Sequence, residues 1–356
     1  MRKAMNYVPI GLREIGVYYP DLVVTSKEIA EKSGIPEDVI VEKFGIGSIR
    51  KALPDENVSD MCVKAAKNCI KGILEPEEIN LIIYHGSEFR DFSLYNCAAH
   101  IQYKLGAKNA ICFQLSVLCA STPLALQVAK SMMLTQPDLK NVLLVTGSRE
   151  SDLVDFRNNR ARAMFNFGDG AAACLLQSNY CKNQILETQI ITDGSFATDV
   201  AVFGVGSVSY HNNISIERDF LKAEEAKAKG NAVGYFGLDV SDPVSTKERL
   251  DTVTLANFFK VIIGAAEKSG YSMKNIKFLA PIFMKSSILN KLLEQLNMNI
   301  NQSYILKDFG HIQSADAYIS LYEGLKLDRI DEGDLIIMLG AGIGYTWAAT
   351  AIKWGV

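Results

Sequence analysis

The stretch Ala110-Ile-Cys-Phe-Gln-Leu-Ser-Val-Leu-Cys-Ala-Ser-Thr-Pro-Leu124 joins an apolar run of strand length to the start of a predicted helix. Pro123 fits the first turn of that helix, because the first N–H groups of a helix have no intrahelical partner. Cys119 lies in the turn between the two, so we expect it at a helix N-terminus. There the unpaired N–H groups and the helix dipole stabilise a thiolate. A buried core cysteine is the alternative, since the chain has seven cysteines.

The second half of the chain repeats the order of these elements. In the first half, the strand, turn and helix are followed by a Gly-rich turn and small residues, Phe167-Gly-Asp-Gly-Ala-Ala-Ala-Cys-Leu-Leu176. In the second half, a strand over Ser303–Leu306 leads through the turn Phe309-Gly-His311 into a helix that starts near Ser314. A Gly-rich turn with small residues follows, Leu339-Gly-Ala-Gly-Ile-Gly-Tyr-Thr-Trp-Ala-Ala-Thr-Ala351. If a pseudo-dyad relates the halves, Cys119 and His311 occupy equivalent turns that can meet. A chance repetition of α/β elements is the alternative.

Apolar runs of strand length alternate with segments of helical period along the chain. The runs are Leu81–Tyr84, Val142–Val145, Gln189–Thr192, Lys277–Pro281 and Leu335–Leu339. Most lack polar alternation, as strands buried on both faces do. Helical periodicity covers 58–70, 255–266 and 286–296. The alternation predicts α/β layers. The charge-dense stretch 217–231 predicts a solvated helix or an exposed excursion.

Composition excludes several classes of function. The 356 residues are 48% hydrophobic and carry a formal net charge of −3 without a Lys/Arg cluster, so no nucleic-acid partner is expected. The longest apolar runs are far shorter than the roughly 20 residues that cross a bilayer, which predicts no membrane span. The segment 1–6 lacks the apolar stretch of a signal peptide, so we expect a cytoplasmic protein.

The cysteines and histidines show no metal-binding pattern. There is no C-x-x-C pair, and the four histidines are scattered without ligand spacing. We therefore expect no metal, and we assign no catalytic role to His85, His100 or His211.

Five motifs in the right order resemble those of the thiolase superfamily, specifically the β-ketoacyl-acyl-carrier-protein synthase III group. They are Gly45-Ile-Gly-Ser-Ile-Arg50, the turn around Cys119, Phe167-Gly-Asp-Gly-Ala171, Asp193-Gly-Ser195 and Gly342-Ile-Gly-Tyr-Thr-Trp347. The resemblance implies a five-layered αβαβα fold of two pseudo-symmetric halves, 1–178 with the nucleophile and 179–356 with the base. It also implies a ping-pong mechanism through an acyl-cysteine, and a homodimer with 81–105 near the interface.

The sequence departs from the condensing enzymes of this group at two motifs. Ile282 stands where the family's condensing histidine belongs, and His311 stands at the position of the condensing asparagine. Asp316 follows five residues later, so the chain resembles an acyltransferase-like branch in which a Cys-His-Asp triad replaces Cys-His-Asn. A histidine backed by a carboxylate is a general base. For His311 the alternative is a helix-capping or buried hydrogen-bonded histidine. For Asp316 it is an acid in the first turn of a helix, where the dipole favours it without a catalytic role.

The resemblance also implies where the thioester oxygen is bound. Gly342, Ile343 and Gly344 fall where the family offers a backbone N–H to this oxygen, jointly with the N–H of Cys119. A tight turn would also require glycine, and the sequence does not separate the two interpretations.

Recognition of the acyl donor is less well defined. The family's tryptophan and arginine for the CoA adenine align near Val39 and Lys43, so this stacking platform is absent. A carrier-protein donor would not need it. Three arginines, Arg157, Arg160 and Arg162, could meet an acidic carrier protein, although a solvated charge cluster is the favoured interpretation.

These observations predict an acyltransferase of the synthase III type, in fatty-acid or polyketide-type metabolism. It would move an acyl group from an acyl-CoA or acyl-carrier-protein thioester through Cys119 to a nucleophilic acceptor, with His311 as base and no permanently bound cofactor. Two alternatives stay open: decarboxylative condensation with a malonyl thioester, and a catalytically silent subunit of a heterodimeric synthase. Retention of Cys119 with His311 argues against the silent subunit.

Overall fold

The computed structural model describes residues 8–210 and 214–355. His211 and the segment 1–6, about which the sequence raised expectations, lie outside the described residues. Among the described helices, none is both long enough and apolar enough to cross a membrane.

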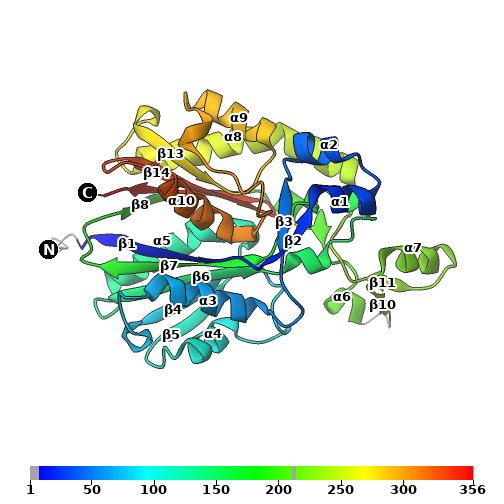
Figure 1. The fold of residues 1–356 in the computed structure, drawn as a ribbon, viewed down its shortest axis with the longest axis horizontal. Coiled ribbons are helices and arrows are strands. Elements are labelled where there is room, and N and C mark those ends of the chain that lie inside the picture. Colours follow the sequence, from blue (N-terminus) through cyan, green and yellow to red (C-terminus); the bar gives the residue numbers. More distant parts are fainter. Residues whose placement is uncertain (1–7, 211–213, 356) are drawn as a thin grey trace.

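One mixed sheet runs through the molecule, and its strands are ordered β13-β14-β15-β8-β1-β7-β6-β4-β5 (Figure 1). The strands are β1 (Ile10–Tyr18), β4 (Leu81–His85), β5 (Ile111–Leu115), β6 (Asn141–Ser148), β7 (Gly170–Ser178), β8 (Gln184–Thr192), β13 (Ile276–Pro281), β14 (Leu335–Gly342) and β15 (Thr346–Lys353). Most of β4, β6, β7, β14 and β15 is buried. The long apolar runs form these strands because both faces are covered by helices.

The sheet consists of two halves with the same topology. In the first half, β5-β4-β6-β7-β1 pair in parallel from β5 to β6 and antiparallel from β6 to β1. In the second, β13-β14-β15-β8 follow the same pattern, and Ser303 bridges Leu279 of β13 in parallel at the place that β5 holds in the first half. The halves meet at the pair Gly11–Gln184 of β1 and β8. The repetition of elements along the sequence is thus a repetition of topology.

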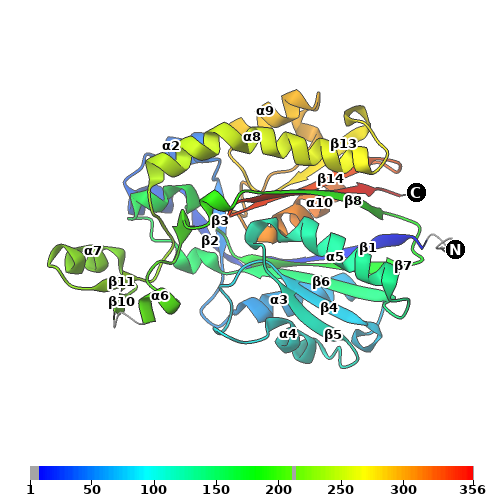
Figure 2. The same ribbon diagram turned by 180° about the vertical axis from the view of Figure 1, so that it is seen from behind.

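Helices form three layers around the two half-sheets. The longer helices are α3 (Val58–Ile70), α4 (Cys97–Leu105), α5 (Ser121–Thr135), α8 (Pro243–Lys268), α9 (Ser286–Gln295) and α10 (Asp316–Lys326). α3 and α4 cover the outer face of the first half-sheet, and α8 and α9 cover that of the second (Figures 1 and 2). α5 and α10 lie between the half-sheets and contact strands of both. The predicted five-layered αβαβα fold is confirmed.

The predicted elements are confirmed with one exception. The strand expected over Ser303–Leu306 is wrong, because only Ser303 pairs with a neighbouring strand and the next residues leave the sheet. The division at residues 178 and 179 stays a prediction, and it falls in the connection between β7 and β8.

The charge-dense stretch 217–231 contains one helix of an arm that projects from the body of the molecule (Figures 1 and 2). The shorter elements, several of them in this arm, are β2 (Leu22–Thr25), α1 (Ser26–Ser33), α2 (Glu37–Val39), β3 (Ser48–Lys51), β9 (Val200–Ala201), α6 (Ser207–Tyr210), β10 (Ser215–Glu217), α7 (Phe220–Ala228), β11 (Val233–Tyr235) and β12 (Asp239–Val240). Both expectations for the stretch are confirmed, since α7 is a solvated helix within an exposed excursion.

A buried carboxyl group lies just after β6. Glu150 is 3% exposed and accepts hydrogen bonds from the Ser148 hydroxyl and from the backbone N–H of Arg149. Burial raises the pKa of Glu150 to about 7, and the charge of Asp169 adds to the rise, against the hydrogen bonds of the nearby serines. The folded protein therefore binds a proton here that the unfolded chain releases near pH 4.5. The stability that this proton contributes is present at low pH and is lost as the pH rises towards 7.

Glu150→Gln should remove this pH dependence, because the amide is neutral throughout. Between pH 5 and pH 8, we expect the free energy of unfolding of the wild type to fall by up to about 3 kcal/mol more than that of the variant. Urea unfolding at several pH values measures the difference. Glu31→Gln, at an exposed position of α1, serves as the control and should follow the wild type. Parallel curves for wild type and Glu150→Gln would contradict the prediction.

Candidate active site

Cys119 lies in a short 3-10 turn, Leu118–Ala120, directly before α5. Leu118 has φ +48°, an uncommon conformation for a residue with a side chain. Glycine on β14 lets that strand approach the turn: a Cβ at Gly342 would lie 2.7 Å from the Val117 carbonyl oxygen and 3.1 Å from the Cys119 nitrogen. The cysteine is 5% exposed. The second half-sheet therefore forms one wall of the nucleophile's turn.

Asp316 holds His311 in place. The His311 Nδ1 lies 2.5 Å from Asp316 Oδ2. The same carboxylate accepts the backbone N–H groups of Ile312 and Phe283, each at 2.7 Å, and is completely buried. On the other side, the His311 N–H donates to the Asn166 carbonyl oxygen. The imidazole is thus fixed through one ring nitrogen and through its own backbone, so that its other nitrogen is left for the chemistry.

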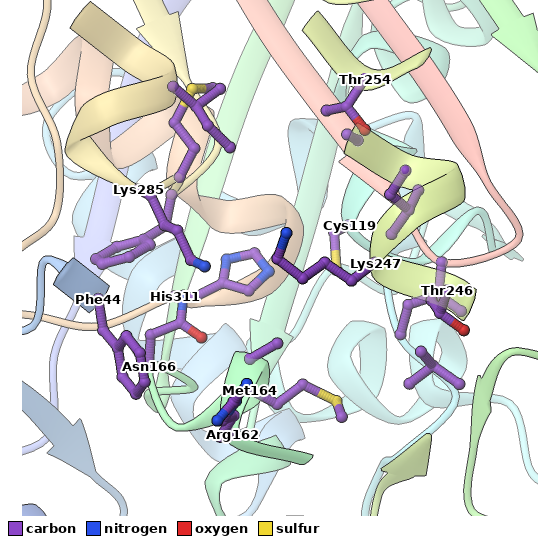
Figure 3. A pocket seen from close by; sticks show the side chains of 18 of the residues that line it. Phe44, Cys119, Arg162, Met164, Asn166, Thr246, Lys247, Thr254, Lys285 and His311 are labelled. Atoms are coloured by element: carbon purple, nitrogen blue, oxygen red, sulfur yellow. The ribbon is translucent and has the colours of Figure 1, made fainter. Parts of the chain in front are cut away.

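The electrostatics of the site favour a charged imidazole. Burial lowers the pKa of His311, but the charges of Asp316 and Cys119 and the hydrogen bonds to both side chains raise it to about 10. The structure places the two predicted side chains together in the lining of one cavity (Figure 3). A histidine with a raised pKa is a good proton acceptor.

Both side chains line a cavity of about 660 Å³. Its walls are mostly apolar, with contributions from Val39, Met164, Leu250, Phe258, Ile282 and Trp347. Three exposed cationic side chains, Arg162, Lys247 and Lys285, also line it (Figure 3). The cavity can take an apolar chain with its reactive end at the cysteine and an anionic group near the exposed cations.

Comparisons with known proteins agree with this geometry. The model for 3-oxoacyl-[acyl-carrier-protein (ACP)] synthase III matches residues 113–194, and its C-terminal counterpart matches residues 266–354. A β-ketoacyl-[acyl-carrier-protein] synthase III of Clostridium beijerinckii is 26% identical over 347 residues, 97% of this chain and 99% of that protein. Over almost its whole length the chain is similar to the synthase III family.

Solved structures of the family share the fold. The 3-oxoacyl-[acyl-carrier-protein] synthase III from Aquifex aeolicus has a TM-score of 0.79 at 25% identity, and covers 97% of this chain and 100% of its own. The corresponding enzyme of Thermus thermophilus has a TM-score of 0.81 at 22% identity, with 97% and 99% covered. Members of the synthase III family are acyl-transferring and condensing enzymes, and the predicted enzyme class is confirmed at that level.

The structure brings the predicted catalytic residues close to one another. Asp316 contacts the His311 ring, and His311 and Cys119 line the same cavity. Gly342 contacts the Cys119 turn, Ile343 lines the cavity, and Gly344 has φ +135° in the turn between β14 and β15.

Only some of the residues that the sequence analysis placed near the acyl donor line the cavity. Val39 lines the cavity, whereas Lys43 does not. Arg157 pairs with Asp155 and Asp219. Arg160 pairs with Glu224 and Asp239, and it also lines the cavity, as exposed Arg162 does. The ion pairs of Arg157 and Arg160 favour the charge-cluster interpretation for these two residues, and a contact of the three arginines with a carrier protein stays a prediction.

Sequence reasoning missed Gln313. Its Oε1 accepts a hydrogen bond from the Cys119 Sγ, and the residue is 3% exposed. Gln313 begins the 3-10 turn Gln313–Ala315 before α10, with φ +51°, just as Leu118 begins the turn before α5 with φ +48°. The sequence offered one signal, since a glutamine two residues after His311 precedes a helix that corresponds to α5.

The other described histidines take no part in this site. Burial lowers the pKa of His85 to about 3, and its ring nitrogens lie 3.4 Å from Ser314 Oγ and 3.5 Å from Tyr318 Oη. His100 Nδ1 lies 3.6 Å from an Asp91 oxygen. Over residues 8–210 and 214–355, no group of three or more His, Cys, Asp or Glu residues could hold a metal ion.

The Asp316→Asn variant tests the orienting role. We expect the rate of Cys119 acylation to fall about 10²–10⁴-fold, because the amide can present a donor to the ring. We also expect a loss of about 1–3 kcal/mol of stability, since the amide nitrogen would face one of the two backbone N–H groups. Rapid-quench mass spectrometry and urea unfolding measure the two effects.

His311→Gln is the matched comparison, because it leaves both backbone hydrogen bonds of Asp316 intact. It should lose a similar share of the acylation rate with a smaller loss of stability. An Asp316→Asn protein that is destabilised but acylated at the full rate would show that Asp316 only anchors the turn.

Proposed function

We propose that this protein transfers an acyl group from a CoA or carrier-protein thioester through acyl-Cys119 to a nucleophilic acceptor. The observation that carries the proposal is the contact of Asp316 with His311 Nδ1, beside Cys119 and at the wall of the cavity. This arrangement is a general base with a fixed tautomer. It fits deprotonation of a hydroxyl, amine or thiol acceptor.

In the first half-reaction, His311 takes the Cys119 proton and the thiolate attacks the thioester carbonyl carbon. The resulting oxyanion lies within reach of the backbone N–H of Cys119 and of the turn Gly342–Gly344, which β14 holds against the nucleophile. The imidazolium returns the proton to the departing CoA or phosphopantetheine thiolate. Cys119 is then an acyl thioester and His311 is neutral.

In the second half-reaction, the neutral imidazole deprotonates the acceptor as it attacks the acyl-cysteine. Collapse of the tetrahedral intermediate releases the Cys119 thiolate and the acylated product. Asp316 stabilises the imidazolium in both half-reactions, because its carboxylate stays within hydrogen-bond distance of Nδ1.

Decarboxylative condensation is the second candidate, because the family includes condensing enzymes. That reaction needs donors on the enolate oxygen of a malonyl thioester. Ile282 lines the cavity where the family's condensing histidine belongs, and it offers no donor. Transfer to a nucleophile needs only the His311–Asp316 pair and is therefore favoured. A silent subunit would have no use for a cysteine and a base in contact.

The cavity supports a donor with an anionic arm. Arg162 and Lys285 line it at exposed positions, and Lys247, although paired with Asp251, adds a third cation. These side chains suit the phosphate of a phosphopantetheine arm, whether it belongs to CoA or to an acidic carrier protein. No permanent cofactor is required by this mechanism, and we infer a cytoplasmic enzyme.

A homodimer also belongs to this proposal. β5 is the last strand of the sheet. Around it and in the predicted interface region 81–105, apolar side chains are strongly exposed: Phe92, Leu94, Tyr103 and Ile111. An open strand edge beside exposed apolar groups favours pairing with a second copy.

The nucleophile is tested by mass spectrometry after incubation with a panel of acyl thioesters. We expect one acyl group per chain on Cys119 and none in Cys119→Ala, because the acyl-enzyme requires this thiol. Cys181→Ala, at an exposed cysteine, should keep the full mass shift. Acylation at another cysteine in the wild type would overturn the assignment.

The type of reaction is tested with a malonyl thioester. We expect no CO₂ release from the acylated wild type and no product longer by two carbons. Ile282→His should not by itself confer condensation, since His311 still occupies the place of the second donor. Efficient decarboxylation by the unmodified protein would establish the condensing alternative.

A further inference from the structure

The side-chain amide of Gln313 contacts the Cys119 sulfur through its oxygen only, and its nitrogen has no hydrogen-bond partner among the described residues. Its Oε1 accepts a hydrogen bond from Cys119 Sγ. Its Nε2 is buried and has no hydrogen-bond partner among the described residues. A buried amide N–H without a partner costs stability, on the order of 1–3 kcal/mol in proteins generally, so such groups call for an explanation.

The backbone keeps this amide at the nucleophile. Gln313 has φ +51° and is 3% exposed, in the turn that precedes α10. The neighbouring Ser314 is anchored as well, because its carbonyl oxygen accepts the Thr122 hydroxyl and its Oγ lies 2.7 Å from Thr146 Oγ1. Since the turns of both halves are tied together, the amide has little freedom to leave the sulfur.

The chemistry of the cysteine changes what the amide must do. While Cys119 is a thiol, it donates its proton and an amide oxygen is the right partner. Once His311 has taken this proton, the sulfur is a thiolate and only accepts hydrogen bonds. An oxygen would then face a negative charge, whereas an N–H would form a charge-assisted hydrogen bond. The terminal torsion of glutamine is soft, so the amide can rotate in place.

We propose that Gln313 is a catalytic residue whose side-chain amide accepts from the Cys119 thiol and, after rotation, donates Nε2–H to the thiolate. The Nε2 hydrogen that is unused beside the thiol is the one that the thiolate requires. Gln313 thereby favours the nucleophilic form of Cys119 together with His311, which stands on the same segment two residues earlier. This inference rests on the proposed function, because both assign Cys119 as the nucleophile.

The pH dependence of Cys119 alkylation tests this role without any thioester. Iodoacetamide reacts with the thiolate, so the rate of modification at Cys119, followed by peptide mass spectrometry, reports the fraction of thiolate. Gln313→Met keeps the length of the side chain and lacks the amide. We expect its rate at pH 7 to fall about 10-fold or more and its pH profile to move to higher pH, because one donor to the thiolate is lost.

Gln313→Glu provides the second variant, because it has the shape of glutamine but cannot donate as a carboxylate. We expect a still larger fall, since its charge would oppose the thiolate. Gln136→Met, at an exposed position after α5, is the control and should follow the wild type. Thermal unfolding establishes that each variant is folded. If Gln313→Met does not fold, Gln313→Glu alone decides.

Profiles of the folded Gln313 variants that superimpose on the wild type would overturn the proposal. The same samples separate it from the proposed function when they are incubated with acyl thioesters. Wild-type protein that shows a Gln313-dependent thiolate but is acylated by no thioester would refute acyl transfer and leave the role of Gln313 standing. Equal acylation and alkylation of wild type and Gln313→Met would refute the role of Gln313 alone.

Discussion

Asp316 is a completely buried carboxylate, and the architecture of the active site depends on how its charge is satisfied. An isolated buried carboxylate is costly, and this one is compensated by two backbone N–H groups and the His311 ring. The donors come from the end of β13 and from the turn before α10. One side chain therefore fixes the distance between the edge of the second half-sheet and the base. The sequence presented helix capping as the alternative to orienting, but α10 has no side-chain cap and the two oxygens of Asp316 hold the His311 ring and two backbone N–H groups outside the helix.

The positions of Cys119 and His311 could be predicted from the repeated order of strand, turn and helix, and that of Asp316 from the family resemblance. Cys119 stands where a strand passes into a helix, and His311 and Asp316 stand five residues apart in the corresponding turn of the other half. Gln313 could not be found in this way. Its contact with Cys119 depends on a positive φ and on the packing of two turns that are far apart in the sequence, and neither leaves a periodic pattern.

The fold shows a similar division. Buried strands such as β4 and β14 could be predicted, because a short apolar run without polar alternation is typical of a strand that is buried on both faces. The strand expected at Ser303–Leu306 failed because strand pairing is decided by neighbours: only Ser303 meets Leu279, whereas the equivalent β5 pairs along its whole length with β4. The repeated topology therefore differs at its outer position, where one half ends in a full strand and the other in a single bridge.

The close contact of Gly342 with the Cys119 turn shows that the two halves, which share a topology, contribute different residues to the site. Cys119 belongs to one half, while His311 and the strand that contacts the Cys119 turn belong to the other. In an assembly of two identical halves, every substitution would appear on both sides of the axis. Joining them in one chain lets a turn that carries a cysteine face a turn that carries a histidine. The asymmetry of the pocket that Cys119 and His311 line therefore depends on the covalent connection of the two halves as well as on their shared fold.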